Sequence, residues 1–195
     1  MRDIGAYEGT KGLEKLLQEI QSVLAQKKKA VVAIAGLPGS GKTYVVKRFV
    51  RLGFGAFGRK DILVIDDNTI YSTRLWRLKW EKLKIEKKTS GNLLESFDAR
   101  IVFFSNWVPS RFLQSADLYV ILQLPEPERI RRLKQREKNA PEKFHIQKEK
   151  DIIPMEEPFD CPQAMTIINR SRGMVRWHLM GLIRRMFSSR KELKS

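Results

Sequence analysis

The stretch GLPGSGKT, residues 36–43, directly follows the apolar run AVVAIA at residues 30–35. Its glycines permit backbone angles and close approaches that a side chain would block, so successive N–H groups can converge on phosphate oxygens. Lys42 can reach the terminal phosphates as a point charge, and the Thr43 hydroxyl can ligate a magnesium ion that bridges them. The stretch matches G-x-x-x-x-G-K-[ST] and predicts a loop that binds ATP or another nucleoside triphosphate with Mg²⁺. The residues expected to hold the nucleotide are Gly36, Leu37, Pro38, Gly39, Ser40, Gly41, Lys42 and Thr43.

The segments on both sides of this loop have the pattern that such a site requires. AVVAIAG, residues 30–36, is a continuous apolar run closed by glycine, which predicts a strand buried on both faces of a parallel sheet. TYVVKRFVRL, residues 43–52, predicts a helix that begins at the loop. Upstream, residues 11–27 carry apolar side chains at i, i+3, i+4 and i+7, which predicts a leading helix.

Apolar runs that alternate with helical segments continue along the chain. Four more strands are predicted at residues 61–67, 99–104, 118–124 and 163–169, and a helix opened by prolines at residues 126–139. This alternation predicts an α/β fold with a mostly parallel five-stranded sheet flanked by helices. We expect a single domain over residues 1–195, with a lid or loop at 137–160 and a basic C-terminal helix and tail at 170–195.

Composition limits the class of protein. With 195 residues, of which 42% are hydrophobic, the chain suits one domain with a sizeable core. The single cysteine, Cys161, cannot form an internal disulfide, which is typical of a reducing compartment. The start of the chain lacks the apolar core of a signal peptide, and no apolar run is long enough to span a membrane. We therefore expect a cytoplasmic protein without membrane contact.

The chain is strongly basic. Lys and Arg total 38 against 22 Asp and Glu, which gives a formal net charge of +16. An excess of this size predicts attraction to polyanions such as nucleic acid; a basic surface that serves solubility alone is the alternative.

Two acids end the second predicted strand. Asp66 and Asp67 end the run ILVIDD, at the sheet edge where folds of this class bind ligands. One carboxylate can hold magnesium and the other can accept a proton from a hydroxyl nucleophile. We place Asp66 with Thr43 at the metal, but the division of roles between the two acids stays open. The alternative is a pair of solvated turn acids.

A helix after the fourth strand carries three arginines. Arg129, Arg132 and Arg136 stand at i, i+3 and i+7, so their guanidinium groups share one face. Guanidinium groups suit the charge that develops on a transferring phosphoryl group. A solvated basic face is the alternative, but the position of the helix favours phosphate contact. We expect Arg132 and Arg136 to be catalytic, together with Lys42, and Arg129 to bind nucleotide.

Over residues 11–187 the chain resembles the P-loop small-molecule kinases of the uridine kinase and nucleoside monophosphate kinase type. Three stretches carry the likeness: GLPGSGKT, ILVIDDNTIY and ADLYVILQLPEPERIRRLKQRE. The resemblance implies a P-loop NTPase fold in which Lys42 and Thr43 of the Walker A loop serve phosphate and magnesium. It also implies that Asp66 or Asp67 is the acceptor's base, that Arg132 and Arg136 belong to the lid, and that residues 169–172 border the adenine pocket.

Two features depart from that family. The third strand ends in Ser105 and Asn106, where many relatives carry an acid. The expected acceptor-binding region, residues 72–97, has no familiar nucleoside-binding signature. It combines Trp76 and Trp80 with lysines and arginines, so RNA is conceivable as the acceptor because rings stack on bases while cations follow a backbone. Core packing of the two tryptophans is the alternative. The lysines and arginines of this expected acceptor-binding region are Arg74, Arg77, Lys79, Lys82, Lys84, Lys87 and Lys88.

Three functions are therefore open. The first is a kinase that moves the γ-phosphoryl group of ATP onto a hydroxyl of a nucleoside or nucleotide, or of RNA. The second is a nucleic-acid-associated NTPase or switch. The third is a binding protein with a vestigial nucleotide site. Oligomeric state is not predicted by any of these patterns.

Overall fold

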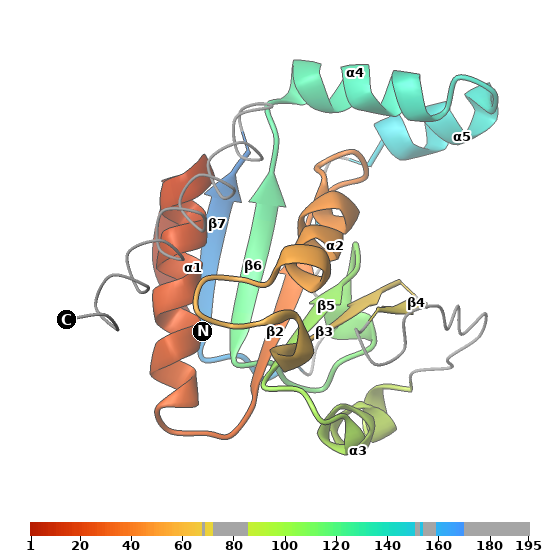
Figure 1. The fold of residues 1–195 in the computed structure, drawn as a ribbon. Coiled ribbons are helices and arrows are strands. Elements are labelled where there is room, and N and C mark those ends of the chain that lie inside the picture. Colours follow the sequence, from red (N-terminus) through yellow and green to blue (C-terminus); the bar gives the residue numbers. More distant parts are fainter. Residues whose placement is uncertain (68, 72–85, 151–152, 154–158, 170–195) are drawn as a thin grey trace.

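A computed structural model of the chain describes residues 1–67, 69–71, 86–150, 153 and 159–169 (Figure 1). The described part is built around a seven-stranded sheet in the order β1-β7-β6-β2-β5-β3-β4. All neighbouring strands are parallel except β3 and β4, which pair antiparallel. The strands are β1 (Arg2–Glu8), β2 (Ala30–Ala35), β3 (Ile62–Asp66), β4 (Thr69–Tyr71), β5 (Ile101–Ser105), β6 (Leu118–Gln123) and β7 (Gln163–Ile168).

The prediction of a mostly parallel α/β sheet is confirmed, but the predicted number of strands was wrong. The five expected strands occupy the consecutive positions β3-β5-β2-β6-β7, and one further strand lies at each edge. Edge strand β1 has no buried residue, so it lacks a run of buried apolar side chains. Its pairing with β7 is also irregular, because the register shifts between Asp3 and Ala6. Edge strand β4 has only three residues. Both therefore lack the sequence pattern by which a strand is predicted.

Helices cover both faces of the sheet. Leu13, Leu16 and Ile20 of α1 and Phe49 of α2 pack in one buried cluster with alternate residues of the strands. Leu94 of α3 belongs to a second cluster on the opposite set of strand residues. The helices are α1 (Gly9–Leu24), α2 (Lys42–Leu52), α3 (Ser90–Ser96), α4 (Glu126–Arg136) and α5 (Pro141–Lys148), with short 3-10 turns η1 (Arg59–Asp61), η2 (Lys87–Thr89) and η3 (Pro109–Arg111).

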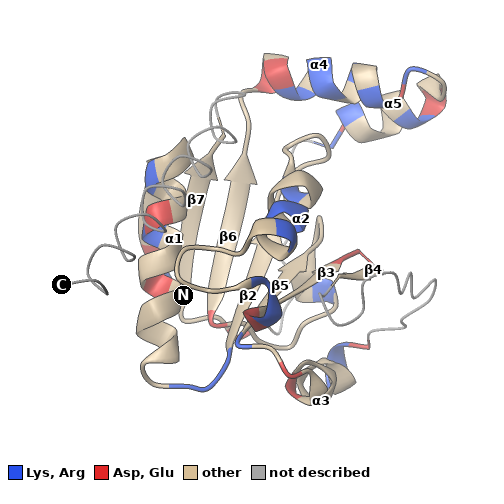
Figure 2. Ribbon diagram, viewed as in Figure 1, with Lys and Arg blue, Asp and Glu red and all other residues tan. Residues whose placement is uncertain are grey.

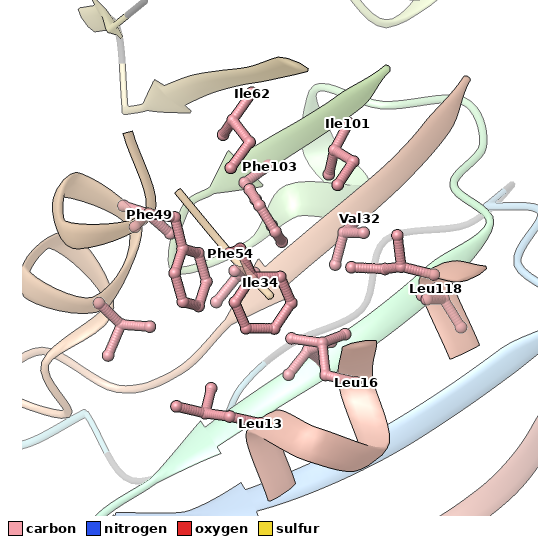
Figure 3. Packing of buried hydrophobic residues seen from close by; sticks show 14 of the residues in the cluster. Leu13, Leu16, Val32, Ile34, Phe49, Phe54, Ile62, Ile101, Phe103 and Leu118 are labelled. Atoms are coloured by element: carbon pink, nitrogen blue, oxygen red, sulfur yellow. The ribbon is translucent and has the colours of Figure 1, made fainter. Parts of the chain in front are cut away.

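Aromatic packing forms the centre of the first cluster (Figure 3). The ring of Phe49 lies 4.8 Å from that of Phe103 and 4.3 Å from that of Phe54, measured between centroids. All three are buried. Since Phe103 comes from β5 and Phe49 from α2, these contacts fix the helix that begins at the phosphate loop against the middle of the sheet.

Replacing Phe103 by alanine should lower the free energy of unfolding by about 3–5 kcal/mol, because the lost ring leaves a cavity under α2. Urea unfolding followed by circular dichroism measures this change. The matched control is Leu52→Ala, at an exposed position at the end of α2, which should change the free energy by less than about 1 kcal/mol. An equally small effect at Phe103 would contradict the packing described.

The order of the strands places the phosphate loop at a switch point. From β2 the chain first builds β3 and β5 on one side, and then crosses to build β6 and β7 on the other. In open α/β sheets, ligands bind at the carboxyl ends of the strands where the order reverses in this way. Figure 1 shows α4 and α5 at the end of the sheet toward which β6 and β7 point. Since β2 runs parallel to β6, the phosphate loop that follows β2 lies at the same end.

The predicted lid or loop, residues 137–160, contains the helix α5. Pro141 occupies the first turn of α5, where a missing N–H leaves no intrahelical bond unmade. The predicted C-terminal helix and tail, residues 170–195, and residues 72–85 of the predicted acceptor region lie outside the described residues. None of the helices in the described part of the chain is both long and apolar enough to cross a membrane.

Candidate nucleotide site

One pocket brings most of the predicted site residues together. It has a volume of about 740 Å³ and lies between the phosphate loop, the ends of β3 and β5, and helices α4 and α5. The pocket is lined by Pro38, Gly39, Gly41, Lys42, Thr43, Tyr44, Lys47, Asp66, Asp67, Asn106, Trp107, Arg132, Arg136, Gln147 and Lys150. This set joins residues that lie far apart in the sequence.

Two glycines give the loop its path. Gly39 has φ +88°, and a Cβ there would lie 3.0 Å from Cγ of Leu133 and 3.2 Å from the backbone oxygen of Arg129. Gly41, with φ +97°, stands immediately before α2. A side chain would be strained at either position. The loop can therefore pack directly on α4 while the unpaired N–H groups at the start of α2 remain available to an anion.

Lys42 extends back over the loop. Its Nζ donates a hydrogen bond of 2.6 Å to the backbone oxygen of Gly36. Burial lowers the pKa of Lys42 to about 8, and the nearby carboxylates of Asp67 and Asp66 oppose this shift only in part. The ammonium group thus lies in a site with too little negative charge to stabilise it fully, and a polyphosphate would supply the missing charge.

We expect nucleotide binding to take up protons above pH 8. Lys42 is mostly neutral there because its pKa is about 8, whereas bound phosphates favour the ammonium form and raise that pKa. Calorimetric titration in buffers of different ionisation enthalpy should show larger proton uptake near about pH 9 than near about pH 7, and weaker affinity at the higher pH. Lys42→Met should remove the uptake. An uptake that is equal at both pH values would contradict the assignment.

The two acids are held by the two polar residues that end the neighbouring strand. Asp66, only 9% exposed, accepts a hydrogen bond of 2.9 Å from the Ser105 hydroxyl, and the two residues are paired in register across β3 and β5. Asp67 accepts a hydrogen bond of 3.0 Å from the side-chain amide of Asn106. Ser105 and Asn106, noted as a departure in the sequence, thus orient the carboxylates of the strand beside them.

Asp67 has an unusual backbone conformation and a raised pKa. It has a positive φ of 52°, unusual for a residue other than glycine, and its N–H donates to the backbone oxygen of Ser105. Burial raises the pKa of Asp67, the neighbouring Asp66 raises it further, and Lys42 opposes the shift. A carboxylate with a raised pKa is a better proton acceptor than an ordinary aspartate.

The donor set fits a magnesium ion that is held partly by a nucleotide. The described residues contain no group of three or more His, Cys, Asp or Glu side chains that could hold a metal by themselves. Mg²⁺ is commonly bound by one or two protein oxygen ligands with water and substrate phosphates completing the shell. The carboxylate of Asp66 and the hydroxyl of Thr43 line the same pocket and are ligands of this kind.

Two of the three predicted arginines line the pocket. Nη1 of Arg132 lies 3.4 Å from where a Cβ on Gly41 would stand, so its guanidinium is close to the loop. Arg136 hydrogen-bonds the side chain of Gln147 from α5. Glu128 accepts from Nε of Arg132 at 2.9 Å and fixes its orientation. Arg132 and Arg136 therefore line the same pocket as Lys42 and the two acids, and their catalytic role stays a prediction.

Arg129 is directed elsewhere. It is 2% exposed, does not line this pocket, and donates to backbone oxygens of the loop and of α5. The expectation that all three guanidinium groups share one phosphate-facing surface is corrected, because the first turn of α4 packs against the loop and α5. With Leu37 and Ser40, Arg129 lines a separate cavity of about 320 Å³.

A comparison with protein families agrees with this geometry. A family model described as an AAA domain matches residues 32–154, which is more than half of the chain. The chain belongs to this AAA-domain family. Its matched span includes the phosphate loop, both acids and α4, so the match indicates a P-loop NTPase-type domain, which is a type that implies nucleotide binding. No curated protein and no solved structure matches the chain.

The AAA domain also brings residues to its pocket that the sequence pattern did not indicate. Tyr44 and Lys47 come from α2, Trp107 follows β5, and Gln147 and Lys150 come from α5 and its end. Tyr44 and Lys47 follow the loop directly in the chain, whereas Trp107, Gln147 and Lys150 lie far from it in sequence and share no motif with it, so only the fold brings these three to the pocket.

The predicted border of the adenine pocket is described only at Asn169. Its side-chain amide donates to the backbone oxygen of Ser40 at 3.5 Å, which ties the end of β7 to the phosphate loop. The rest of that predicted border, residues 170–172, lies outside the described residues.

Proposed function

We propose that the protein is a kinase that transfers the γ-phosphoryl group of ATP to a hydroxyl of a nucleoside- or nucleotide-type acceptor. One observation carries the proposal: a second acid, Asp67, is held by Asn106 in the same pocket as Lys42 and the arginines of α4. Nucleotide binding and metal need only Lys42, Thr43 and Asp66. The additional carboxylate has the chemistry of a base for an acceptor hydroxyl. The resemblance to uridine kinase and nucleoside monophosphate kinases supports the same activity.

In this reaction each group has a separate task. N–H groups of the loop and the Lys42 ammonium hold the β- and γ-phosphates. Asp67 accepts the proton of the acceptor hydroxyl as its oxygen forms a bond to the γ-phosphorus and the bond to the β,γ-bridging oxygen breaks. Arg132 and Arg136 stabilise the negative charge that spreads over the transferring group. The ADP oxygen keeps the electron pair of the broken bond.

Magnesium, held through Thr43 and Asp66, would neutralise charge on the β- and γ-phosphates. Asp66 suits this role because its hydrogen bond from Ser105 fixes one carboxylate oxygen and leaves the other for the ion or its water. This division assigns Asp66 to the metal and Asp67 to the acceptor.

Two lysines that line the pocket with Asp67 favour an acceptor that is itself anionic. Nζ of Lys47 lies 4.8 Å from the centre of the Tyr71 ring, and Nζ of Lys150 lies 3.8 Å from that of Trp107. Cations held over aromatic rings can turn toward a phosphate, and the rings can then stack on a base. A nucleotide, either free or at the end of an RNA, has both a phosphate for the lysines and a base for the rings.

A nucleic-acid-associated NTPase or switch is the second candidate. It is favoured by the net charge of +16 and by the basic residues along α2 and α4 (Figure 2). Ser105 and Asn106 count against it, since the strand beside the loop ends without an acid to activate water.

The deciding experiment incubates the protein with γ-labelled ATP and Mg²⁺ in parallel reactions, which contain nucleosides, nucleoside monophosphates or short RNA as the acceptor. Label on an organic acceptor supports the kinase, and label released only as inorganic phosphate overturns it in favour of the NTPase.

We expect nucleoside monophosphates or RNA to be better acceptors than nucleosides, by roughly tenfold in kcat/KM. Lys47→Met and Lys150→Met should reduce that preference, whereas Lys143→Met on α5 should not.

A further inference from the structure

Arg129 is the most deeply buried charged residue among the described ones, although it stands in the first turn of α4. Its guanidinium makes two contacts of 2.6 Å with the carboxylate of Glu126, through Nε and Nη2. Glu126 is 60% exposed, so this ion pair extends from the surface to a buried position. The pair alone does not explain the burial, because a guanidinium could pair equally well with its carboxylate in solvent.

The remaining hydrogens of the guanidinium point to two different parts of the chain. Nη1 donates to the backbone oxygen of Pro38 in the phosphate loop at 3.4 Å and to that of Gln147 at 3.3 Å. Nη2 donates to the backbone oxygen of Lys148 at 3.1 Å. Gln147 and Lys148 end α5, where carbonyl groups lack intrahelical partners and favour a cation. One planar side chain therefore joins the loop to the end of α5.

These contacts continue to Arg136, one of the two arginines of α4 that line the pocket. The side chain of Gln147, whose backbone oxygen accepts from Arg129, also accepts a hydrogen bond from Arg136. On the other side, Cγ and the backbone oxygen of Arg129 lie against Gly39, where a Cβ would come within 3.3 Å of both. A movement of the loop would thus reach Arg136 through Arg129 and Gln147.

We propose that Arg129 is a positioning residue that couples the phosphate loop to helix α5, so that nucleotide bound at the loop fixes Gln147 and, through it, Arg136. The coupling rests on nucleotide binding by the loop. Its effect on turnover rests in addition on the proposed kinase function. Arginine is required because its fork of donors spans Pro38 and the end of α5 at once, which the single ammonium group of lysine cannot do.

The chain supplies a matched control on the same helix. Arg131 pairs with Glu128 at the same i, i+3 spacing, with contacts of 2.6 and 2.7 Å, but it is 52% exposed, and among the described residues its hydrogen bonds reach only that carboxylate. Arg131→Met removes an ion pair of the same geometry without touching the loop or α5.

Hydrogen exchange measured with and without a nonhydrolysable ATP analogue and Mg²⁺ tests the proposal without requiring catalysis. In the wild type, we expect the analogue to slow exchange in the loop and in α5 together. In Arg129→Met and Arg129→Lys, the loop should still be protected, while the slowing in α5 falls by roughly tenfold or more. Arg131→Met should behave as the wild type. Arg129→Lys keeps the buried charge and decides the matter if the methionine variant does not fold.

Turnover provides a second readout that separates positioning from general damage. The nucleotide Kd of Arg129→Lys should stay within about threefold of wild type, whereas kcat should fall by roughly tenfold or more, because Arg136 is displaced rather than removed. Wild-type protection of α5 by the analogue in Arg129→Lys, or an equal loss in Arg131→Met, would overturn the coupling. If no phosphoryl transfer is found for the wild type, the kinase proposal fails while the exchange result still decides the coupling.

Discussion

Replacement of Lys42 by methionine is expected to lower nucleotide-dependent turnover by roughly 10²- to 10³-fold, because one preorganised cation is lost from the transferring phosphates. Methionine keeps most of the length of the side chain and removes the ammonium group that hydrogen-bonds the backbone oxygen of Gly36. Since burial already lowers the pKa of Lys42 to about 8, removing the charge should not destabilise the fold. Turnover is measured with labelled ATP, and folding is checked by urea unfolding.

The matched control for this variant is Lys134→Met. Lys134 is exposed on α4 and does not line the pocket, so turnover should stay within about twofold of wild type. Unchanged turnover in Lys42→Met would remove the phosphate loop from the mechanism. A comparable loss in Lys134→Met would show that net charge, rather than position in the pocket, determines the rate.

Asp67→Asn is expected to lower phosphorylation of the acceptor by about 10²- to 10⁴-fold while nucleotide still binds. Asparagine has the shape of aspartate and can still accept the hydrogen bond from Asn106, but it cannot take a proton from a hydroxyl. Single-turnover measurement of labelled acceptor, alongside calorimetric titration with nucleotide, separates the chemical step from binding.

Asp66→Asn gives the comparison that distinguishes the two acids. This variant should require more Mg²⁺ for half-maximal rate, because Asp66 is assigned to the ion, and its rate should recover in part at high Mg²⁺. Asp67→Asn should not recover. If the two variants exchange these behaviours, the assignment of base and metal ligand is reversed, and if Asp67→Asn keeps full activity, Asp67 is not the base.

The phosphate loop and the sheet around it could be predicted from the sequence because their determinants are local. Three glycines, one lysine and the flanking apolar runs lie within residues 30–52, and each acts through its neighbours in the chain. The edge strands β1 and β4 were missed because they are stabilised by pairing with β7 and β3 rather than by a pattern of their own.

The direction of a side chain on α4 could not be predicted from spacing alone. Helical spacing places Arg129 near Arg132 and Arg136, but it does not show what packs against the first turn. That turn lies against the loop and the end of α5, so Arg129 donates to backbone oxygens instead of facing the pocket. Contacts of this kind depend on segments that are separated in sequence by up to 91 positions.

Ser105 and Asn106 illustrate a different limit. In the sequence they stand out only as the absence of an acid after the third predicted strand. Because β3 and β5 pair in parallel register, Ser105 lies beside Asp66, and the following residues form the second pair, Asn106 with Asp67. The sequence contains both pairs, but the register that joins them is a property of the sheet.

The most direct test is calorimetric titration of the wild-type protein and Lys42→Met with a nonhydrolysable ATP analogue in the presence of Mg²⁺. We expect saturable binding at one site of the wild type, with a Kd between roughly 1 μM and 1 mM, and binding at least about tenfold weaker in Lys42→Met. Absence of binding to the wild type, or equal affinity in the two proteins, would contradict nucleotide binding by residues 36–43.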